Sequence, residues 1–203
     1  MKEITKIVVT GGPCGGKTSA MKHIKDVFSR EGYTVLFISE TATELISGGV
    51  APWTCNTNAE YQCIQMKMQM RKEELYHEAA LHIPGDRFLI VCDRAELDNK
   101  AYMNEEEYAW VLKVNGWTEE ELIAPYDAVF HLETAAKHGG AAFYQLDNNT
   151  ARYESPEGAC QVDDRLIEAW KNHPHHYIIE YSDGFEEKMN RLIECIRGIL
   201  KTL

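Results

Sequence analysis

A glycine-rich segment near the N-terminus, GGPCGGKT at residues 11–18, constrains this chain more than any other feature. It matches the pattern G-x-x-x-x-G-K-[ST], in which glycines let the backbone curl closely around an anion. The β-branched run at residues 4–10 predicts a strand before it, and apolar residues at helical spacing over residues 19–30 predict a helix after it. A strand, a glycine loop and a helix in this order hold a nucleotide phosphate at the helix N-terminus.

The loop assigns a role to each of its polar groups. Backbone N–H groups would point at the phosphates, the Lys17 ammonium would reach the β- and γ-phosphates, and the Thr18 hydroxyl would hold Mg²⁺. The residues predicted to bind the nucleotide here are Gly12, Pro13, Cys14, Gly15, Gly16, Lys17, Thr18 and Ser19. We expect ATP, with GTP as the alternative, because residues 99–102 do not complete the Asn-Lys-x-Asp element of guanine recognition.

Composition bounds the class of protein. With 203 residues, of which 44% are hydrophobic, the chain is long enough for one buried core, and we expect a single domain over residues 1–203. The formal net charge of −11 argues against a nucleic-acid partner, because phosphate backbones attract basic surfaces. Six cysteines without a C-x-x-C pair favour a reducing, cytoplasmic compartment. We expect no membrane insertion, because no apolar run approaches the length of a spanning helix.

Apolar runs and helical patterns alternate along the rest of the chain. Further strands are predicted at residues 34–39, 88–92, 128–132 and 177–180, and helices at residues 41–46, 58–82, 104–114, 118–123 and 185–203. This alternation predicts an α/β fold with a five-stranded parallel sheet, helices on both faces and a ligand at the carboxyl ends of the strands. The polar and then helical stretch at residues 133–174 is where we expect an inserted lid over the phosphates.

Charged residues follow two of the predicted strands. Glu40 ends the second strand, and Asp93 and Arg94 end the third, so all three are expected at the edge that carries the glycine loop. Asp93 suits a Mg²⁺ anchor or a proton acceptor, and Glu40 suits a base for an acceptor hydroxyl. Arg94 suits an anionic or hydroxyl-bearing substrate, because its planar fork donates several hydrogen bonds. Each residue also has a purely structural alternative. Asp93 could cap the turn after its strand, Glu40 could be an acid favoured at a helix N-terminus, and Arg94 could form a structural salt bridge.

Two further residues are assigned to the nucleotide. Arg152, in the predicted lid, would bring positive charge to the γ-phosphate in the transition state, although an exposed helix charge is its plain alternative. Asp183, in the turn after the last strand, would lie against the nucleotide base. The His-Pro-His-His run at residues 173–176 lacks the spacing of a zinc site, so the metal expected is Mg²⁺ at Thr18 and Asp93.

Sequence blocks at residues 10–18, 40–46, 93–102, 148–152 and 170–175 occur together and cover nearly the whole chain. Together they resemble the NadR-like AAA ATPase domain family, which is related to ribosylnicotinamide kinase and to nucleoside and nucleotide kinases. The resemblance implies a P-loop kinase-type sheet in the order 2-3-1-4-5 with a lid over the phosphates, and it names no substrate. Ala95 departs from the pattern, since similar sequences often place glycine after the Asp-Arg pair.

These features support two functions of different classes. The first is a Mg²⁺-dependent kinase that moves the γ-phosphoryl group of ATP to a small hydroxyl-bearing, nucleoside-like metabolite, with the catalytic residues Lys17, Glu40, Asp93, Arg94 and Arg152. The second is a regulatory ATPase or GTPase in which the lid, or the glycine loop at residues 47–50, reorders with the nucleotide and controls a protein partner. A ring-forming AAA remodeller ranks last, because the chain is too short for the additional helical domain of such machines.

Overall fold

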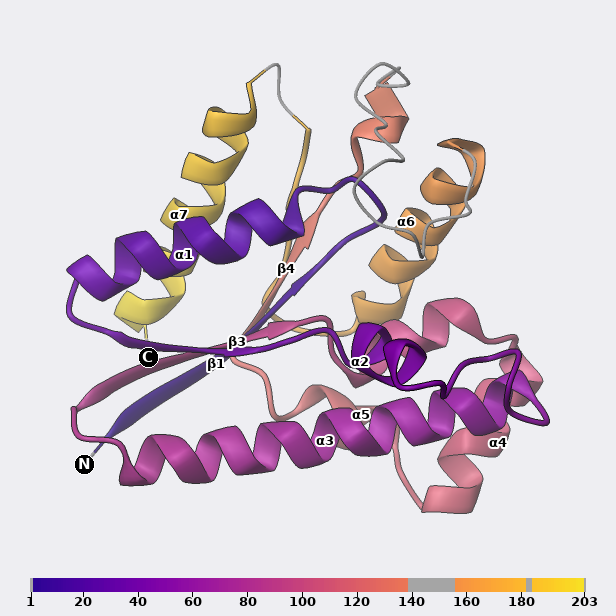
Figure 1. Ribbon diagram of the computed structural model, residues 1–203. Coiled ribbons are helices and arrows are strands. Elements are labelled where there is room, and N and C mark those ends of the chain that lie inside the picture. The colour runs from indigo at the N-terminus through magenta and orange to yellow at the C-terminus, as the bar shows by residue number, and fades with distance from the viewer. Residues whose placement is uncertain (1, 139–155, 182–183, 203) are drawn as a thin grey trace.

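The computed structural model describes residues 2–138, 156–181 and 184–202 of the chain. The strands are β1 (Glu3–Thr10), β2 (Thr34–Ile38), β3 (Arg87–Asp93), β4 (Ala128–Leu132) and β5 (His176–Ile179). They form one parallel sheet in the order β2-β3-β1-β4-β5 (Figure 1). This order confirms the predicted 2-3-1-4-5 sheet and the α/β fold class.

Helices fill the connections between the strands. They are α1 (Lys17–Arg30), α2 (Thr41–Ser47), α3 (Asn58–His82), α4 (Glu105–Asn115), α5 (Glu119–Ile123), α6 (Pro156–Trp170) and α7 (Phe185–Thr202), with the 3-10 helices η1 (Glu96–Tyr102) and η2 (Ala135–His138). The strands and helices predicted from the sequence are all present, with ends shifted by one or two residues. No helix in the described part of the chain is both long and apolar enough to cross a membrane.

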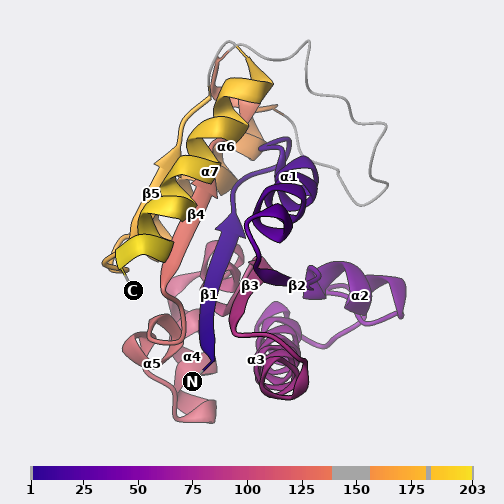
Figure 2. The same cartoon turned by 90° about the vertical axis from the view of Figure 1, so that its left-hand side faces the viewer.

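Alternate residues of β1 face opposite layers of the domain. Val8 belongs to a buried cluster with Met66 of α3 and Trp170 of α6. Ile7 belongs to a second buried cluster, which includes Ile24 of α1 and apolar residues of α7. The two views of the ribbon show α1 and α7 on one side of the sheet and α3 on the other (Figures 1 and 2). Helices therefore cover both faces, as the sequence predicts for a doubly buried parallel sheet.

The strand register brings the predicted site residues to one edge of the sheet. Val9 of β1 is paired with Asp93 at the end of β3. Ile38 of β2 is paired with Cys92, so that Glu40 follows just beyond the end of β2. Since the glycine loop leaves the same end of β1, three separate segments bring their candidate site residues to a common region.

Part of the range predicted as a lid is a helix packed into the domain. Within residues 133–174, α6 buries Leu166 against Ala101 of η1 and places Trp170 in the cluster beneath the sheet. The Trp170 indole N–H donates to Asp98 Oδ1 at 2.9 Å. Residues 139–155 lie outside the described residues, so the lid itself stays a prediction.

Candidate nucleotide and acceptor site

The glycine loop between β1 and α1 requires glycine at two points. Gly11 has a φ of 137° and Gly16 a φ of 91°, values that side chains other than glycine rarely adopt. A Cβ atom at Gly11 would lie 2.2 Å from the carbonyl oxygen of Leu132, at the end of β4. The loop therefore packs its backbone directly against the end of the neighbouring strand, which fixes its path over the sheet edge.

Lys17 lies across the loop that it is expected to serve. Its Nζ donates to the carbonyl oxygens of Gly11 at 2.9 Å and Gly12 at 3.3 Å. Burial, and then the positive charge of Arg94, lower the pKa of Lys17 to about 8, against the attraction of Asp93. The ammonium is thus held at the mouth of the loop, where phosphate oxygens would compete with the two carbonyls.

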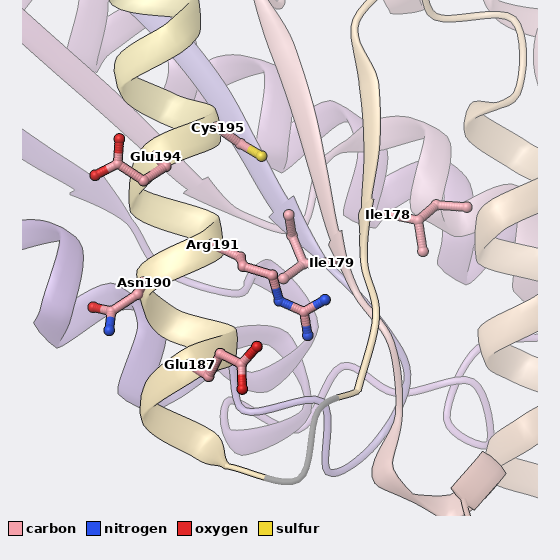
Figure 3. A pocket seen from close by; sticks show the side chains of 7 residues that line it. All are labelled: Ile178, Ile179, Glu187, Asn190, Arg191, Glu194 and Cys195. Atoms are coloured by element: carbon pink, nitrogen blue, oxygen red, sulfur yellow. The ribbon is translucent and has the colours of Figure 1, made fainter.

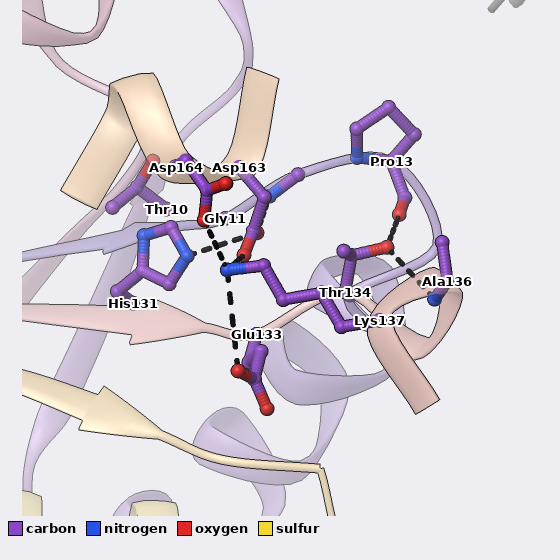
Figure 4. A network of polar contacts seen from close by, with 12 residues as sticks. Thr10, Gly11, Pro13, His131, Glu133, Thr134, Ala136, Lys137, Asp163 and Asp164 are labelled. Carbon is purple, nitrogen blue, oxygen red and sulfur yellow. Dashed lines mark hydrogen bonds and ion pairs between the residues drawn. The ribbon is translucent and has the colours of Figure 1, made fainter. Parts of the chain in front are cut away.

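An acidic side chain from α6 holds the loop from outside (Figure 4). Asp163 is fully buried, and its Oδ1 accepts the Gly12 N–H at 2.8 Å and lies 2.9 Å from His131 Nε2. Its Oδ2 lies 2.8 Å from Lys137 Nζ. Burial opposes the carboxylate charge, but contacts with His131, Lys137 and the Gly12 N–H lower the pKa of Asp163 to about 2. Asp163 therefore stays charged and holds the Gly12 N–H in place. The contact of Gly12 with the nucleotide stays a prediction.

Two more side chains bind carbonyl groups of the loop. Thr134 Oγ1, just after β4, donates to the Pro13 carbonyl at 2.6 Å (Figure 4). Lys188 Nζ, on α7, donates to the carbonyls of Gly15 at 2.9 Å and Glu133 at 2.6 Å. The loop is therefore held by hydrogen bonds from side chains of three neighbouring segments.

The end of β3 delivers Asp93 and Arg94 beside the loop. The Arg94 N–H donates to the Val9 carbonyl at 3.1 Å, and Arg94 has a φ of 68°. This left-handed conformation is uncommon for a residue with a side chain, and it turns the chain sharply after Asp93. Asp93 Oδ1 is buried and has no hydrogen-bond partner in the described structure. Burial raises the pKa of Asp93 above its ordinary value, although the charge of Lys17 opposes the shift.

Glu40 forms an ion pair with Arg94. Its Oε1 accepts from Arg94 Nε at 2.7 Å, and its Oε2 accepts from Thr43 Oγ1 at 2.7 Å. Burial opposes the charge of this carboxylate, but the Arg94 guanidinium and the Thr43 hydroxyl lower the pKa of Glu40 to about 2. A carboxylate with so low a pKa is a weak base, and its contact with Arg94 suits a role in positioning that side chain. The predicted role of Glu40 as a base stays a prediction.

The residues expected to hold Mg²⁺ fit the chemistry of that ion. Thr18 is exposed in the first turn of α1, and Asp93 keeps one buried oxygen unpartnered. The described residues contain no group of three or more His, Cys, Asp or Glu side chains that would cage a metal. Mg²⁺ commonly retains water and is bound by one or two protein oxygens together with substrate phosphates. Thr18 and Asp93 would therefore hold an ion that arrives with the nucleotide and neutralises phosphate charge.

The remaining predicted residues divide into two groups. Cys14, with a φ of 59°, lies in the loop, and Ser19 is exposed in the first turn of α1. Arg152 and Asp183 lie outside the described residues, so their nucleotide contacts stay predictions.

Two hollows lie apart from these residues. One, of about 360 Å³, opens between β5 and α7, and Figure 3 shows its lining. It is lined by Ile178, Ile179, Glu187, Asn190, Arg191, Glu194 and Cys195. The other, of about 380 Å³, lies between α3 and the segment before β4 and includes Glu73 and Leu122. No predicted site residue lines either hollow, so neither is identified with the nucleotide site.

Sequence reasoning missed the side chains that hold the loop, namely Asp163, Thr134 and Lys188. A signal existed for Asp163, because it shares the buried face of α6 with Ala159, Leu166 and Trp170, where an acid needs a partner. Lys188 likewise lies on the buried side of α7, beside Met189 and Leu192. The partners of these residues are backbone groups far away in the sequence. The sequence pattern can therefore indicate a buried polar residue but cannot predict which group it contacts.

The comparisons with known proteins agree with this geometry. A family model described as an AAA domain matches residues 6–188, a range that includes the glycine loop, Glu40, Asp93 and Asp163. The search of curated proteins found no match. The family match spans most of the chain, and the parallel sheet with its glycine loop is the fold expected of such a domain. The chain therefore belongs to this AAA domain family and is a nucleotide-binding P-loop domain.

Proposed function

We propose that the protein is a Mg²⁺-dependent kinase that transfers the γ-phosphoryl group of ATP to a small, hydroxyl-bearing metabolite of nucleoside-like type. The observation that carries the proposal is a pair of buried, unpartnered atoms at the end of β3, Asp93 Oδ1 and Arg94 Nη1. Convergent polar groups of this kind beside a phosphate loop suit a second substrate. The NadR-like relationship belongs to the same proposal.

In the proposed reaction, an acceptor hydroxyl oxygen bonds to the γ-phosphorus while the bond from that phosphorus to the bridging oxygen breaks, and ADP leaves. The unpartnered oxygen of Asp93 suits either a Mg²⁺ ligand or a proton acceptor, and in this proposal it accepts the hydroxyl proton, for which its raised pKa suits it. Lys17 exchanges its loop carbonyls for phosphate oxygens and stabilises their charge. Arg94, held by Glu40, orients the acceptor. Arg152 adds positive charge at the γ-phosphate.

Other properties of the protein belong to the proposal as well. ATP is the preferred nucleotide, with GTP as the alternative. The acidic composition supports small-molecule substrates over nucleic acid, and no membrane partner is proposed. A cytoplasmic location rests on the cysteine usage of the sequence.

The second candidate is a regulatory ATPase or GTPase that controls a protein partner. It is supported by two contacts with the glycine loop, that of Thr134 with Pro13 and that of Asp163 with Gly12. Thr134 and Asp163 lie on either side of residues 139–155 in the sequence. A change in the loop on nucleotide binding would act on both flanking segments.

Product analysis separates the two candidates. ADP and GDP release from ATP and GTP would be measured with Mg²⁺, with and without a panel of nucleosides, nucleotides and nicotinamide riboside. A kinase releases ADP faster with one acceptor, which gains a phosphoryl group, and both Lys17→Ala and Asp93→Asn abolish the effect. Slow release that no acceptor changes, together with tight nucleotide binding, would overturn the kinase proposal in favour of the regulatory NTPase.

A further inference from the structure

The turn after β3 brings Asp93 and Arg94 beside the glycine loop, and its backbone conformation is uncommon. Arg94 has a φ of 68°, in the left-handed region that residues with side chains rarely adopt. The ion pair with Glu40 holds the Arg94 guanidinium, whereas Asp93 Oδ1 is buried without a hydrogen-bond partner among the described residues. The placement of this oxygen therefore depends on contacts that fix the backbone of the turn.

The side chain of Asp98, in η1, supplies such a contact. Asp98 is 2% exposed, and its Oδ2 accepts the Ala95 N–H at 3.0 Å. The Asp98 N–H in turn donates to the Ala95 carbonyl at 3.1 Å. This reciprocal pair closes the turn immediately after Arg94, as an acid in the first turn of a helix does. It uses only one of the two carboxylate oxygens.

The other oxygen of Asp98 binds two segments that are distant from it in the sequence. Its Oδ1 accepts from Thr10 Oγ1 at 2.7 Å and from the Trp170 indole N–H at 2.9 Å. Thr10 is fully buried, and as the last residue of β1 it immediately precedes Gly11 of the glycine loop. Closing a turn requires neither contact. One buried carboxylate thus joins the base of the loop, the turn after β3 and the C-terminal end of α6.

The negative charge of Asp98 also acts on the lysine of the loop. Burial and the charge of Arg94 lower the pKa of Lys17, and the charges of Asp93, Glu40 and Asp98 oppose that shift. Replacing Asp98 would therefore change both the hydrogen bonds and the electrostatics of the site. A variant at the base of the loop that breaks a contact of Asp98 but keeps its charge separates the two effects.

We infer that Asp98 is a positioning residue that fixes the turn carrying Asp93 and Arg94 relative to the glycine loop. It acts through these two residues and is assigned no contact with nucleotide or acceptor. The placement serves Asp93 equally as a Mg²⁺ ligand or as a proton acceptor. The inference rests on the proposed function for its catalytic readout, whereas its geometric readout needs no turnover.

Amide hydrogen exchange, followed residue by residue, tests the geometric part. Thr10→Val removes no partner of a backbone N–H in the turn, yet the Arg94 and Ala95 amides should exchange about fivefold faster or more, because the turn loses a contact that holds it. Asp127, just before β4, is the matched control, because its Oδ2 likewise holds β1, at the Lys6 N–H and 2.7 Å away. Asp127→Asn should leave both amides unchanged. Unchanged exchange in Thr10→Val would overturn the inference.

ADP release from ATP with Mg²⁺ tests the functional part, since both candidate functions release ADP. Asp98→Asn should lower kcat by about tenfold or more with a smaller change in the KM for ATP, because slight misplacement of reacting groups has large effects. Thr10→Val, which keeps the charge, should also lower kcat, and Asp127→Asn should not. A loss confined to Asp98→Asn would assign the effect to its charge and overturn the inference, as would an unchanged kcat in both variants. If wild type binds nucleotide without releasing ADP, the proposed function fails, while the exchange measurement still decides the placement of the turn.

Discussion

The glycine loop and the proposed acceptor site at Asp93 and Arg94 lie at the same edge of the sheet but differ in how their polar groups are partnered. Around the loop, Asp163, Thr134 and Lys188 each form a hydrogen bond with a backbone group. At the proposed acceptor site, Asp93 Oδ1 and Arg94 Nη1 have no hydrogen-bond partner in the described part of the chain. The loop is thus positioned by contacts that the protein already makes, whereas acceptor binding would depend on side-chain atoms that a ligand completes.

The largest loss of activity is expected when the proposed proton acceptor, Asp93, is removed. We expect Asp93→Asn to reduce kcat by roughly 10²–10⁴-fold, the usual contribution of general base catalysis, with nucleotide affinity nearly retained. The wild-type rate should fall as the pH drops toward the raised pKa of Asp93, because the protonated carboxyl cannot accept a proton. Steady-state rates across pH check both points, with exposed Asp26→Asn as the control. Retention of kcat within tenfold in Asp93→Asn would contradict the assignment.

The next largest effect is expected when Lys17 of the glycine loop is replaced. Lys17→Ala is expected to lower kcat/KM for ATP by roughly 10²–10³-fold, since one charged donor to the developing phosphate charge is lost. Nucleotide titration and turnover provide the measurement, and Lys25→Ala, exposed on the same helix, is the matched control. Equal losses in both variants would show that the effect is not specific to the loop.

The support for the loop can be tested with two adjacent acids. Asp163→Asn is expected to raise the KM for ATP more than it changes kcat, and to lower the free energy of unfolding at neutral pH by about 1–3 kcal/mol. Asp164 also contacts Lys137, at 2.7 Å, but its side chain is 69% exposed, so Asp164→Asn should have little effect on either quantity. Nucleotide titration and urea unfolding of both variants check this. Indistinguishable variants would remove Asp163 from the set of positioning residues.

The same acid predicts a pH dependence of stability. The pKa of Asp163 is lowered from 3.8 to about 2 by folding, so its contribution is fully present above 3.8 and is lost as the pH falls through about 2. The difference corresponds to about 2 kcal/mol. Acid unfolding curves of wild type and Asp163→Asn should therefore converge as the pH falls through this window, and parallel curves would argue against the low pKa.

The smallest effect on activity is expected at Thr43, which contacts Glu40. Thr43→Val removes one hydrogen bond to Glu40 and leaves the Arg94 ion pair in place. Acceptor KM should rise by less than about tenfold, with kcat and nucleotide affinity unchanged. A loss as large as that of Asp93→Asn would mean that Thr43 has a role beyond orienting Glu40.

The sequence predicted the fold well because its signals are local. The apolar run at residues 88–92 predicts a strand, and the glycine pattern predicts a phosphate-binding loop, each from its own residues alone. The alternation of strands with helices then predicts a parallel sheet. The positions of Glu40 and Asp93 followed from strand ends. The opposite shifts of their pKa values did not, because the lowered pKa of Glu40 depends on the Arg94 contact, which joins residues distant in sequence.

Asp163 shows why the rest of the site was missed. It lies at helical spacing with apolar neighbours, so the periodic pattern gives it no role in the site. Only the three-dimensional structure reveals that its carboxylate holds the Gly12 N–H.

The position of Lys17 has a consequence for the heat of nucleotide binding. Since its ammonium already has two carbonyl partners, binding exchanges hydrogen bonds and adds few. Its pKa of about 8 leaves the lysine partly deprotonated in mildly alkaline solution, and a bound phosphate favours the charged form. Nucleotide binding should therefore take up a proton from the buffer near pH 8, and calorimetric heats should differ between buffers of different ionisation enthalpy.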